Sequence, residues 1–401
     1  MLTKLFPKVH RRYEQSTFAP DLEDFASWLL AKGYSRDNTC DHLFRLRKTL
    51  EGREHIAPGA VLSEVQLESA FTSSRFPALY RGTQRAFARF LDSRGRLVPT
   101  VSSEPFARLR ADYGQHLREL RGFAATTAQQ HQSTVADFLA RGIPKEKGLR
   151  ELCHTDIEHY VQLRSKEVTR QTLQHTVAHL RAFMRYCYAH EKTAVALDGI
   201  DTPRTYRGEL PPRALDWKLV LRLLASVDRN SRAGWRDYTI LHLLAYYGLR
   251  PSEVAALQLI SIDWSAKTLV VAQSKTRSTL VLPLANRTLH LLRRYLRQGR
   301  AVNDRPELFL RVRHPSGGLT HYAVVNIFQK RARLSGLPLE GCSSYGLRHA
   351  FAMRLLRRGV GVKAIGDLLG HHSLESTCVY LRLDTDMLRC VALPVPSKLH
   401  E

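Results

Sequence analysis

Apolar residues recur every three or four positions along most of the chain, which is the pattern of helices that bury one face. Val177, Leu180, Phe183 and Cys187 illustrate it, because they fall on one side of a helix expected over 172–189. The same period predicts further helices over 21–31, 38–50, 126–139, 237–247, 320–334, 344–358, 362–369 and 373–381.

A different pattern interrupts these helices in the second half of the chain. Two β-branched runs, 268–272 and 279–284, flank a polar turn and predict a hairpin. Gly248 is placed to end the helix over 237–247, and Asn286 to cap a helix that continues to Gln298. The predicted fold class is therefore mainly α with a small antiparallel sheet.

Prolines mark two linkers, 97–105 and 200–212, and divide the chain into 1–100, 101–205 and 206–401. The first two segments resemble each other. Arg85-Ala-Phe-Ala-Arg-Phe90 matches Arg181-Ala-Phe-Met-Arg-Tyr186, and the Gly33-Tyr34…His42 series matches Gly122-Phe123…His131. We interpret this as a duplicated helical unit. The alternative is chance similarity between two basic amphipathic helices.

Composition narrows the class of partner. The chain of 401 residues has 61 Lys and Arg against 37 Asp and Glu, a net charge of +24, which favours a polyanion. No run approaches the roughly 18 apolar residues of a membrane span, and the first residues lack the apolar core of a secretion signal. The six cysteines form no CxxC pair, so we expect reduced thiols in a cytoplasmic, DNA-associated protein.

Four pieces of the last segment carry residues suited to breaking a phosphodiester without a metal. They are Gly248-Leu-Arg-Pro-Ser-Glu-Val254, Ser274-Lys-Thr-Arg277, Tyr345-Gly-Leu-Arg-His349 and Leu369-Gly-His-His-Ser-Leu-Glu-Ser-Thr-Cys-Val-Tyr380. Arg250 and Arg348 can bind the nonbridging oxygens and stabilise the transition-state charge. Tyr380 can attack as nucleophile, Lys275 can protonate the leaving 5′ oxygen, and His371 can position the phosphate or carry a proton.

These blocks resemble the tyrosine recombinase (phage-integrase) family. Its catalytic domain has an arginine in a G-L-R-x-x-E turn, a hairpin lysine, an H-x-x-R-H helix, and L-G-H nine residues before a nucleophilic tyrosine. The resemblance places these roles on Arg250, Lys275, Arg348, His371 and Tyr380.

The remaining motif residues have supporting or altered roles. Tyr345 stands where the family has its first histidine, and a phenol accepts protons poorly near neutral pH, so slower or differently assisted proton transfer is expected. Glu253 is expected to orient Arg250, and His349 to bond the backbone near the site. His371 and His372 lack a third ligand at fitting spacing, so no metal is predicted. No nucleotide cofactor is expected, because a phosphotyrosine would keep the energy of the broken bond.

The resemblance implies two SAM-like helical DNA-binding units in front of a DNA breaking–rejoining catalytic domain. The unit at 101–205 is similar to the family's core-binding domain, and the copy at 1–100 would be an arm. The implied function is site-specific recombination of double-stranded DNA through a 3′-phosphotyrosyl intermediate, in integration, excision or transposition of a mobile element. The family works as a synaptic tetramer, here a homo-oligomer with or without other recombinases. The tail from Leu381 to Glu401 either docks on a neighbouring subunit or folds back.

Two alternatives come from other classes. A type IB topoisomerase shares the chemistry but relaxes supercoils without exchanging strands between partners. A catalytically weak or silent DNA-binding accessory recombinase is suggested by Tyr345. A covalent protein–DNA species formed through Tyr380 would exclude the silent protein, and relaxation without recombination sites would favour the topoisomerase.

Overall fold

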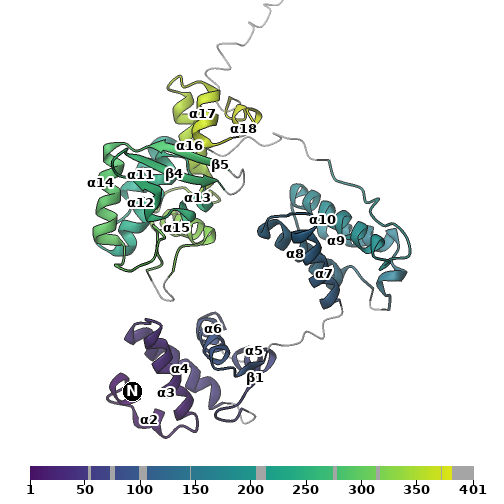
Figure 1. The fold of residues 1–401 in the computed structure, drawn as a ribbon, viewed down its shortest axis with the longest axis vertical. Coiled ribbons are helices and arrows are strands. Elements are labelled where there is room, and N and C mark those ends of the chain that lie inside the picture. The colour runs from purple at the N-terminus through teal and green to yellow at the C-terminus, as the bar shows by residue number, and fades with distance from the viewer. Residues whose placement is uncertain are drawn as a thin grey trace, which may run out of the picture. The chain divides into compact units, whose positions relative to one another are not determined.

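The computed structural model describes residues 1–52, 56–72, 77–98, 106–144, 146–204, 214–273, 278–312, 317–371 and 373–381 (Figure 1). Within these ranges the chain is mainly helical with a small antiparallel sheet, as predicted. The chain divides into two compact units, one of Pro99–Glu209 and one of Met1–Val98 with Leu210–Glu401, and the two segments of the latter have separate hydrophobic cores. None of the described helices is both long and apolar enough to cross a membrane.

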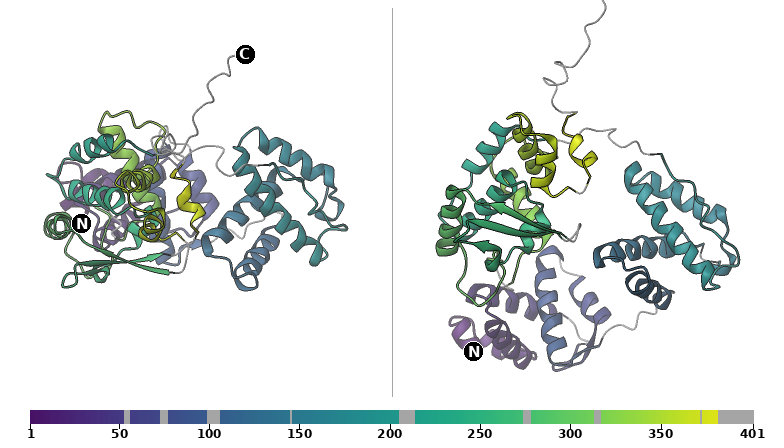
Figure 2. Two further views of the ribbon diagram at one scale, coloured as in Figure 1. Left: turned by 90° about the horizontal axis from the view of Figure 1, so that it is seen from above. Right: turned by 45° about the horizontal axis from the view of Figure 1, so that its top comes forward.

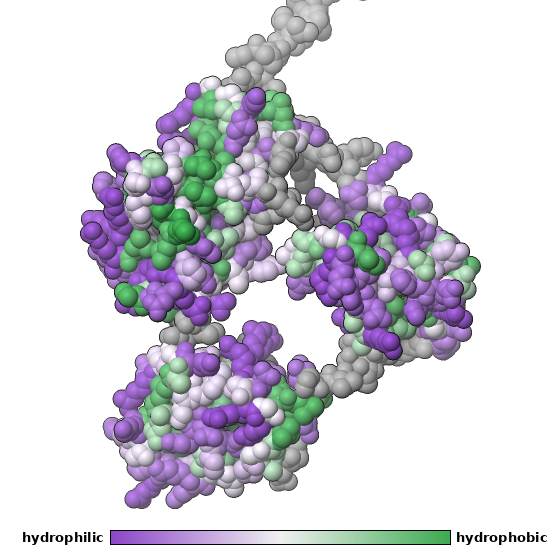
Figure 3. Space-filling model, viewed as in Figure 1, coloured by the Kyte–Doolittle hydropathy of each residue, from purple (hydrophilic) through white to green (hydrophobic). Residues whose placement is uncertain are grey.

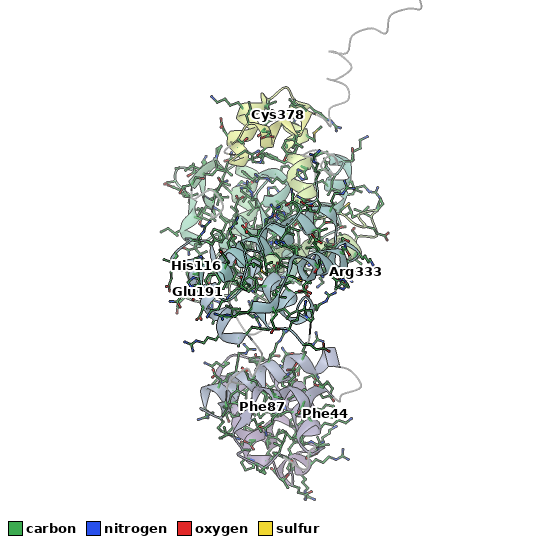
Figure 4. All side chains as sticks on the ribbon, turned by 90° about the vertical axis from the view of Figure 1, so that its right-hand side faces the viewer. Phe44, Phe87, His116, Glu191, Arg333 and Cys378 are labelled. Atoms are coloured by element: carbon green, nitrogen blue, oxygen red, sulfur yellow. The ribbon has the colours of Figure 1, made fainter. Side chains whose placement is uncertain are left out.

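The N-terminal unit is a cluster of helices tied by one short parallel ladder. Its elements are α1 (Leu2–Leu5), α2 (Arg11–Glu14), α3 (Ala19–Ala31), α4 (Arg36–Leu50), β1 (Leu62–Ser63), α5 (Glu64–Thr72), α6 (Pro77–Ser93) and β2 (Leu97–Val98). Ser35 caps α4 by accepting a hydrogen bond from the Asn38 amide. Figure 4 labels the buried Phe87 and the exposed Phe44 of this unit.

The second unit is wholly helical where it is described. It consists of α7 (Ala107–Glu119), α8 (Ala125–Arg141), the 3₁₀ turn η1 (Leu149–Glu151), α9 (His154–Ser165) and α10 (Arg170–Ala189). The predicted stripe of Val177, Leu180, Phe183 and Cys187 on α10 is completely buried. Its exposed face is polar, so the sequence period located the packing face correctly.

The two helical units repeat a set of aromatic contacts at positions that the predicted duplication aligns with each other, and the duplication stays a prediction. In each, one ring on the first long helix meets two rings on the last helix, one edge-on and one tilted. The pairs are Phe25–Phe87 (5.3 Å between ring centroids), Phe25–Phe90 (5.4 Å), Tyr113–Phe183 (5.1 Å) and Tyr113–Tyr186 (5.0 Å). The ring pairs Tyr34–His42 and Phe123–His131 also correspond, at 5.5 and 5.3 Å. Gly33 and Gly122, which precede these aromatic residues, both have positive φ.

The third segment folds around a core of helices and a three-stranded antiparallel sheet of order β3-β4-β5 (green arrows in Figure 2). Its elements are α11 (Trp217–Ala225), α12 (Arg232–Tyr246), α13 (Pro251–Ala256), η2 (Leu259–Ser261), β3 (Ile262–Asp263), β4 (Thr268–Gln273), β5 (Ser278–Pro283), α14 (Asn286–Arg294), the π-helical η3 (Tyr295–Gly299), α15 (His321–Leu334), α16 (Tyr345–Leu356), α17 (Val362–Leu369) and α18 (Glu375–Cys378). The hairpin pairs Thr268 with Pro283 and Gln273 with Ser278.

Three local expectations need correction. Ala285, not Asn286, is the N-cap of α14, and its amide donates to the Tyr247 hydroxyl. The helix expected over 373–381 is shortened to Glu375–Cys378, because the chain turns there to carry Tyr380 inward. Leu97–Val98, assigned to a linker, pairs with Leu62–Ser63. The hairpin tip 274–277 and the tail beyond Leu381 lie outside the described residues.

Candidate active site

The turn after α12 positions the first predicted arginine. Gly248 has φ +60, which ends the helix, and Arg250 then caps α13. The Glu253 carboxylate accepts from the Arg250 backbone amide at 2.7 Å and from its guanidinium at 2.5 Å. Glu253 is buried, so this carboxylate both caps the helix and fixes the arginine side chain, as predicted for Glu253.

The second arginine, Arg348, lies on α16 and joins three of the predicted motifs. Its guanidinium donates to the carbonyl oxygens of Gly248 and Leu369, each at 2.6 Å, and lies 3.9 Å from Glu253. Burial and the nearby Arg250 lower the pKa of Arg348 to about 10, so it remains charged at neutral pH. The buried carboxylate of Glu253 therefore lies beside the guanidinium cations of both Arg250 and Arg348.

Gly248 is required for this close approach. A side-chain carbon there would lie 2.6 Å from a ring atom of Phe351 and 2.8 Å from a methyl of Leu369. Its left-handed backbone also strains any other residue. The glycine of the G-L-R turn thus lets α16 and α17 pack against the turn that carries Arg250.

Tyr380 lies beyond α18 with 3% of its side chain exposed, packed among residues of α16 and α17. Its hydroxyl lies 3.1 Å from Nδ1 of His349. Burial raises the pKa of this phenol, and the positive charges of Arg348 and Arg250 partly offset that rise. The phenolic oxygen is thus buried within the electrostatic range of both arginines.

This contact corrects the expectation for His349. We predicted that it bonds the backbone, whereas its ring contacts the Tyr380 hydroxyl. The physical reason is that His349 follows Arg348 on α16 and faces the chain that returns after α18. Burial and then the charge of Arg348 lower the pKa of His349, so its ring is neutral at pH 7.

His371 follows the left-handed Gly370 that ends α17. Its Nδ1 lies 2.8 Å from the hydroxyl of Thr377, and its ring lies nearly parallel to that of Tyr380 with centroids 6.5 Å apart. Burial and the two arginines lower the pKa of His371 to about 4, so the imidazole is neutral at pH 7. With Nδ1 engaged by Thr377, Nε2 is left to face a ligand.

The base of the predicted hairpin also reaches this site. Gln273, the last residue of β4, is buried against Gly370, where an added side-chain carbon would lie 2.0 Å from the Gln273 amide nitrogen. Lys275, the predicted general acid, lies outside the described residues. Tyr345 lies one turn before Arg348 on α16, with 41% of its side chain exposed.

The structure therefore brings together Arg250, Glu253, Arg348, His349, His371 and Tyr380 from four separate segments, and places Tyr345 beside them. Sequence reasoning did not single out Thr377 or Gln273. The spacing of Thr377, six residues after His371 and three before Tyr380, was the available signal. Among the described residues, no group of three or more His, Cys, Asp or Glu could hold a metal ion.

A mainly helical unit that gathers two arginines, two histidines and a tyrosine can bind a phosphodiester and offer it an oxygen nucleophile. That combination is typical of DNA strand transferases that act through a tyrosine.

Comparison with known proteins identifies the family. Residues 213–387 match the model of the phage integrase family. A putative integrase/recombinase of Sinorhizobium fredii (strain NBRC 101917 / NGR234), y4rA, is 30% identical over 289 residues, which cover 71% of this chain and 70% of that protein. A second from the same organism, y4gC, is 40% identical over 188 residues, covering 46% of this chain and 97% of that protein.

A solved structure has the same fold. The XerH site-specific recombinase, bound to a palindromic difH substrate in a post-cleavage complex, superimposes with a TM-score of 0.56 at 14% identity, covering 70% of this chain and 83% of that chain. The chain belongs to the phage integrase family of tyrosine recombinases, which are DNA strand transferases.

Proposed function

We propose that this chain cleaves and rejoins duplex DNA at specific sites through a 3′-phosphotyrosyl link on Tyr380, and so integrates, excises or transposes a mobile element. The observation that carries the proposal is that Arg250 and Arg348 share the buried carboxylate of Glu253, while their charges act on both His371 and Tyr380. These residues come from segments up to 130 positions apart, and two guanidiniums brought beside a tyrosine hydroxyl support a role in binding a phosphate.

The cleavage step is a displacement at phosphorus. The Tyr380 oxygen attacks the scissile phosphate and forms the P–O bond to tyrosine, while the bond to the 5′ oxygen breaks. The phenolic proton passes to Nδ1 of the neutral His349, which lies 3.1 Å away. Rejoining is the reverse step with a 5′ hydroxyl as nucleophile, so no external energy source is needed.

The charged residues hold the phosphate during that step. Arg250 and Arg348 bind the nonbridging oxygens, and Glu253 keeps both guanidiniums in place. His371, neutral and bonded through Nδ1 to Thr377, donates from Nε2. Tyr345, which is 41% exposed, adds a hydrogen bond from its hydroxyl, in place of the proton acceptor that a histidine would provide.

Lys275 is proposed as the general acid that protonates the leaving 5′ oxygen. Its support is the packing of Gln273 against Gly370, because Gln273 is two residues before Lys275 and Gly370 directly precedes His371. Lys275 therefore follows, by two residues, a strand end that packs against the phosphate-binding motif, which supports a role as general acid at the leaving group.

The partner is double-stranded DNA, and the assembly a homotetramer on paired sites, with or without other recombinases. In this proposal the catalytic domain spans 206–401, the core-binding unit 101–205, and the arm 1–100. The repeated aromatic contacts support two related DNA-gripping units. A net charge of +24 suits contacts to the phosphate backbone.

The decisive experiment is a nicked duplex that carries the DNA ends of the element encoding the chain. After cleavage the short 5′-hydroxyl strand diffuses away, and the covalent complex accumulates and is counted on a denaturing gel. Wild type is expected to form it, and Tyr380→Phe to form none while still binding the duplex. If wild type forms no covalent species, or Tyr380→Phe forms as much, the proposal fails. Relaxation of a supercoiled plasmid that lacks those ends would support the topoisomerase instead.

A further inference from the structure

A second basic feature lies on the catalytic segment, away from the residues that surround Tyr380. It is an open cavity of about 600 Å³ between α12 and the helix formed by α14 and η3. Five arginines line it: Arg229, Arg287, Arg293, Arg294 and Arg297. Figure 3 shows hydrophilic residues gathered along the side of this segment where Figure 1 places α14. We call this feature the arginine cavity.

The five guanidiniums have no acidic partner among the described residues. No carboxylate lines the arginine cavity, and none of the five makes an ion pair or a side-chain hydrogen bond with any residue that the structure describes. Nearby Arg236 and Arg331 behave differently, because they share the buried Asp237. A structural arginine pairs in this way, whereas five exposed and unpaired arginines around one hollow are suited to an anionic ligand.

Aromatic residues on α12 hold some of these arginines in place. The Arg229 guanidinium lies 4.7 Å from the ring centroid of Tyr238, and that of Arg294 lies 5.9 Å from the ring centroid of Trp235. These cation–π contacts order the side chains. They also place guanidinium cations beside the rings of Tyr238 and Trp235 at the cavity. The arginine cavity therefore presents ordered positive charge, which is suited to phosphates.

The spacing along the helix indicates how long the ligand is. Arg287 and Arg297 are ten residues apart, which corresponds to about 15 Å along a helix. Duplex DNA carries a phosphate about every 3.4 Å along each strand, so a row of this length covers several phosphates. A single phosphate or a mononucleotide would leave most of the arginines without a partner.

We propose that the arginine cavity is a second, sequence-independent binding site for the backbone of duplex DNA, separate from the reaction site. None of Arg250, Arg348, His371 or Tyr380 lines it. The identity of the ligand rests on the proposed function, since a recombinase brings two duplexes and their flanking segments close to its catalytic unit. The site would hold such a segment while the reaction site holds the scissile phosphate.

The test is the salt dependence of DNA binding. The triple variant Arg287→Gln/Arg294→Gln/Arg297→Gln removes three charges from the arginine cavity. Binding of the full chain to a 30-base-pair random duplex is followed by fluorescence anisotropy between 50 and 300 mM salt. The slope of log K against log salt is expected to be shallower by about 2 to 3, with affinity lowered about tenfold or more at low salt.

A matched control removes the same number of charges elsewhere on the same segment. Lys218, Arg222 and Lys267 are exposed, do not line the arginine cavity and make no ion pair with any described residue. The triple glutamine variant at these positions should leave the slope within about one unit of wild type. Equal changes of the salt slope in both variants, or no change of the slope in the cavity variant, would overturn the proposal. The proposal would also fail if the cavity variant lost binding of tripolyphosphate while its binding of DNA stayed unchanged.

The outcome is independent of the cleavage chemistry. On saturating nicked duplex the cavity variant should still form the covalent complex through Tyr380. If wild type forms no covalent complex but the salt slopes differ as expected, the proposed function fails while the binding site stands. If cleavage occurs and the slopes do not differ, only the second site is wrong.

Discussion

His349 and Tyr380 form a hydrogen-bonded pair in which both pKa values are displaced. Burial raises the pKa of the Tyr380 phenol, so the hydroxyl keeps its proton at neutral pH. Burial and Arg348 lower the pKa of His349, so its ring is unprotonated there. The oxygen holds a proton, and the nitrogen 3.1 Å away is able to accept it. The pair is thus arranged for proton transfer as the tyrosine attacks.

Replacing His349 with alanine is expected to slow covalent complex formation about 100-fold, a usual contribution of general-base catalysis. In wild type the rate should fall only at a pH lower than about 6.5, the ordinary pKa of histidine, because burial and Arg348 lower the pKa of His349 and a protonated ring cannot accept a proton. The variant should lack this fall. Single-turnover rates on the nicked duplex between pH 4.5 and 8 measure both effects.

His371→Ala is the matched control, because it removes a neighbouring neutral histidine that does not contact the Tyr380 hydroxyl through a hydrogen bond. The His371→Ala variant should react more slowly, yet its rate should still decrease at acidic pH because His349 becomes protonated. If His349→Ala slows the reaction equally at every pH and the rate still decreases at acidic pH, His349 is a structural residue and the proton has another acceptor.

Residue spacing located most of this site because the chemistry is concentrated in short motifs. Arg250 and Glu253 are three residues apart on one turn, and Arg348 and His349 are adjacent. Each pair is therefore close in space because it is close in sequence. The contact of His349 with Tyr380, and of Gln273 with Gly370, joins residues 31 and 97 positions apart. Such contacts depend on how α16, α17 and the sheet pack, which no spacing within one motif specifies.

At the scale of elements, a buried ion cluster joins α12 to α15. Asp237, with 1% of its surface exposed, accepts from Arg236 at 2.8 Å on one oxygen and from Arg331 at 2.8 Å on the other. Arg236 also donates to the Leu310 carbonyl. The carboxylate thus neutralises two arginines that are themselves mostly buried.

Asp237→Ala is expected to lower the free energy of unfolding by about 3 kcal/mol, since it leaves two buried guanidiniums without their partner. Urea unfolding followed by circular dichroism measures the change. Asp304→Ala, at an exposed loop position of the same segment, should alter stability by less than about 0.5 kcal/mol. A loss at Asp237 as small as at Asp304 would mean that water or a neighbouring group compensates the two arginines.

Elements were predicted correctly where the hydrophobic pattern repeats over several helical turns. α8, α10, α12 and α15 each present a buried stripe over several turns, so their ends were placed within a few residues. It failed at short elements fixed by tertiary contacts. Asn286 has the side chain of a cap, yet the Tyr247 hydroxyl binds the Ala285 amide and the helix begins at Asn286 itself. The β1–β2 ladder has two residues a strand, too few for a period.

At the scale of the whole molecule, net positive charge is concentrated in the last segment, because acidic residues are scarce there. Residues 206–401 hold 30 of the 61 Lys and Arg but only 14 of the 37 Asp and Glu. The helical units at 1–100 and 101–205 are nearly balanced in comparison. Electrostatic attraction to DNA is therefore strongest on the segment that carries both the Tyr380 site and the arginine cavity, and salt should weaken its binding most.

Buried histidines make the whole molecule sensitive to acid. Burial lowers the pKa of His179, His242 and His371 to about 4 each, from an ordinary value near 6.5. Between these values the unfolded chain binds protons that the folded chain does not. The stability that these neutral histidines contribute is therefore fully present above about pH 6.5 and is lost as the pH falls toward 4.

His242 gives the sharpest test, because it is 3% exposed and bonded to Thr288 in the core of the catalytic segment. His242→Asn is expected to be less stable than wild type at pH 7.5, yet to lose less of its remaining stability between pH 6.5 and 4.5, by on the order of 1–3 kcal/mol. The measurement is urea unfolding followed by tryptophan fluorescence at each pH. His290→Asn, at an exposed position of the same segment, should follow the wild-type pH dependence. If His242→Asn follows it too, the acid sensitivity of this segment comes from groups other than its buried imidazole.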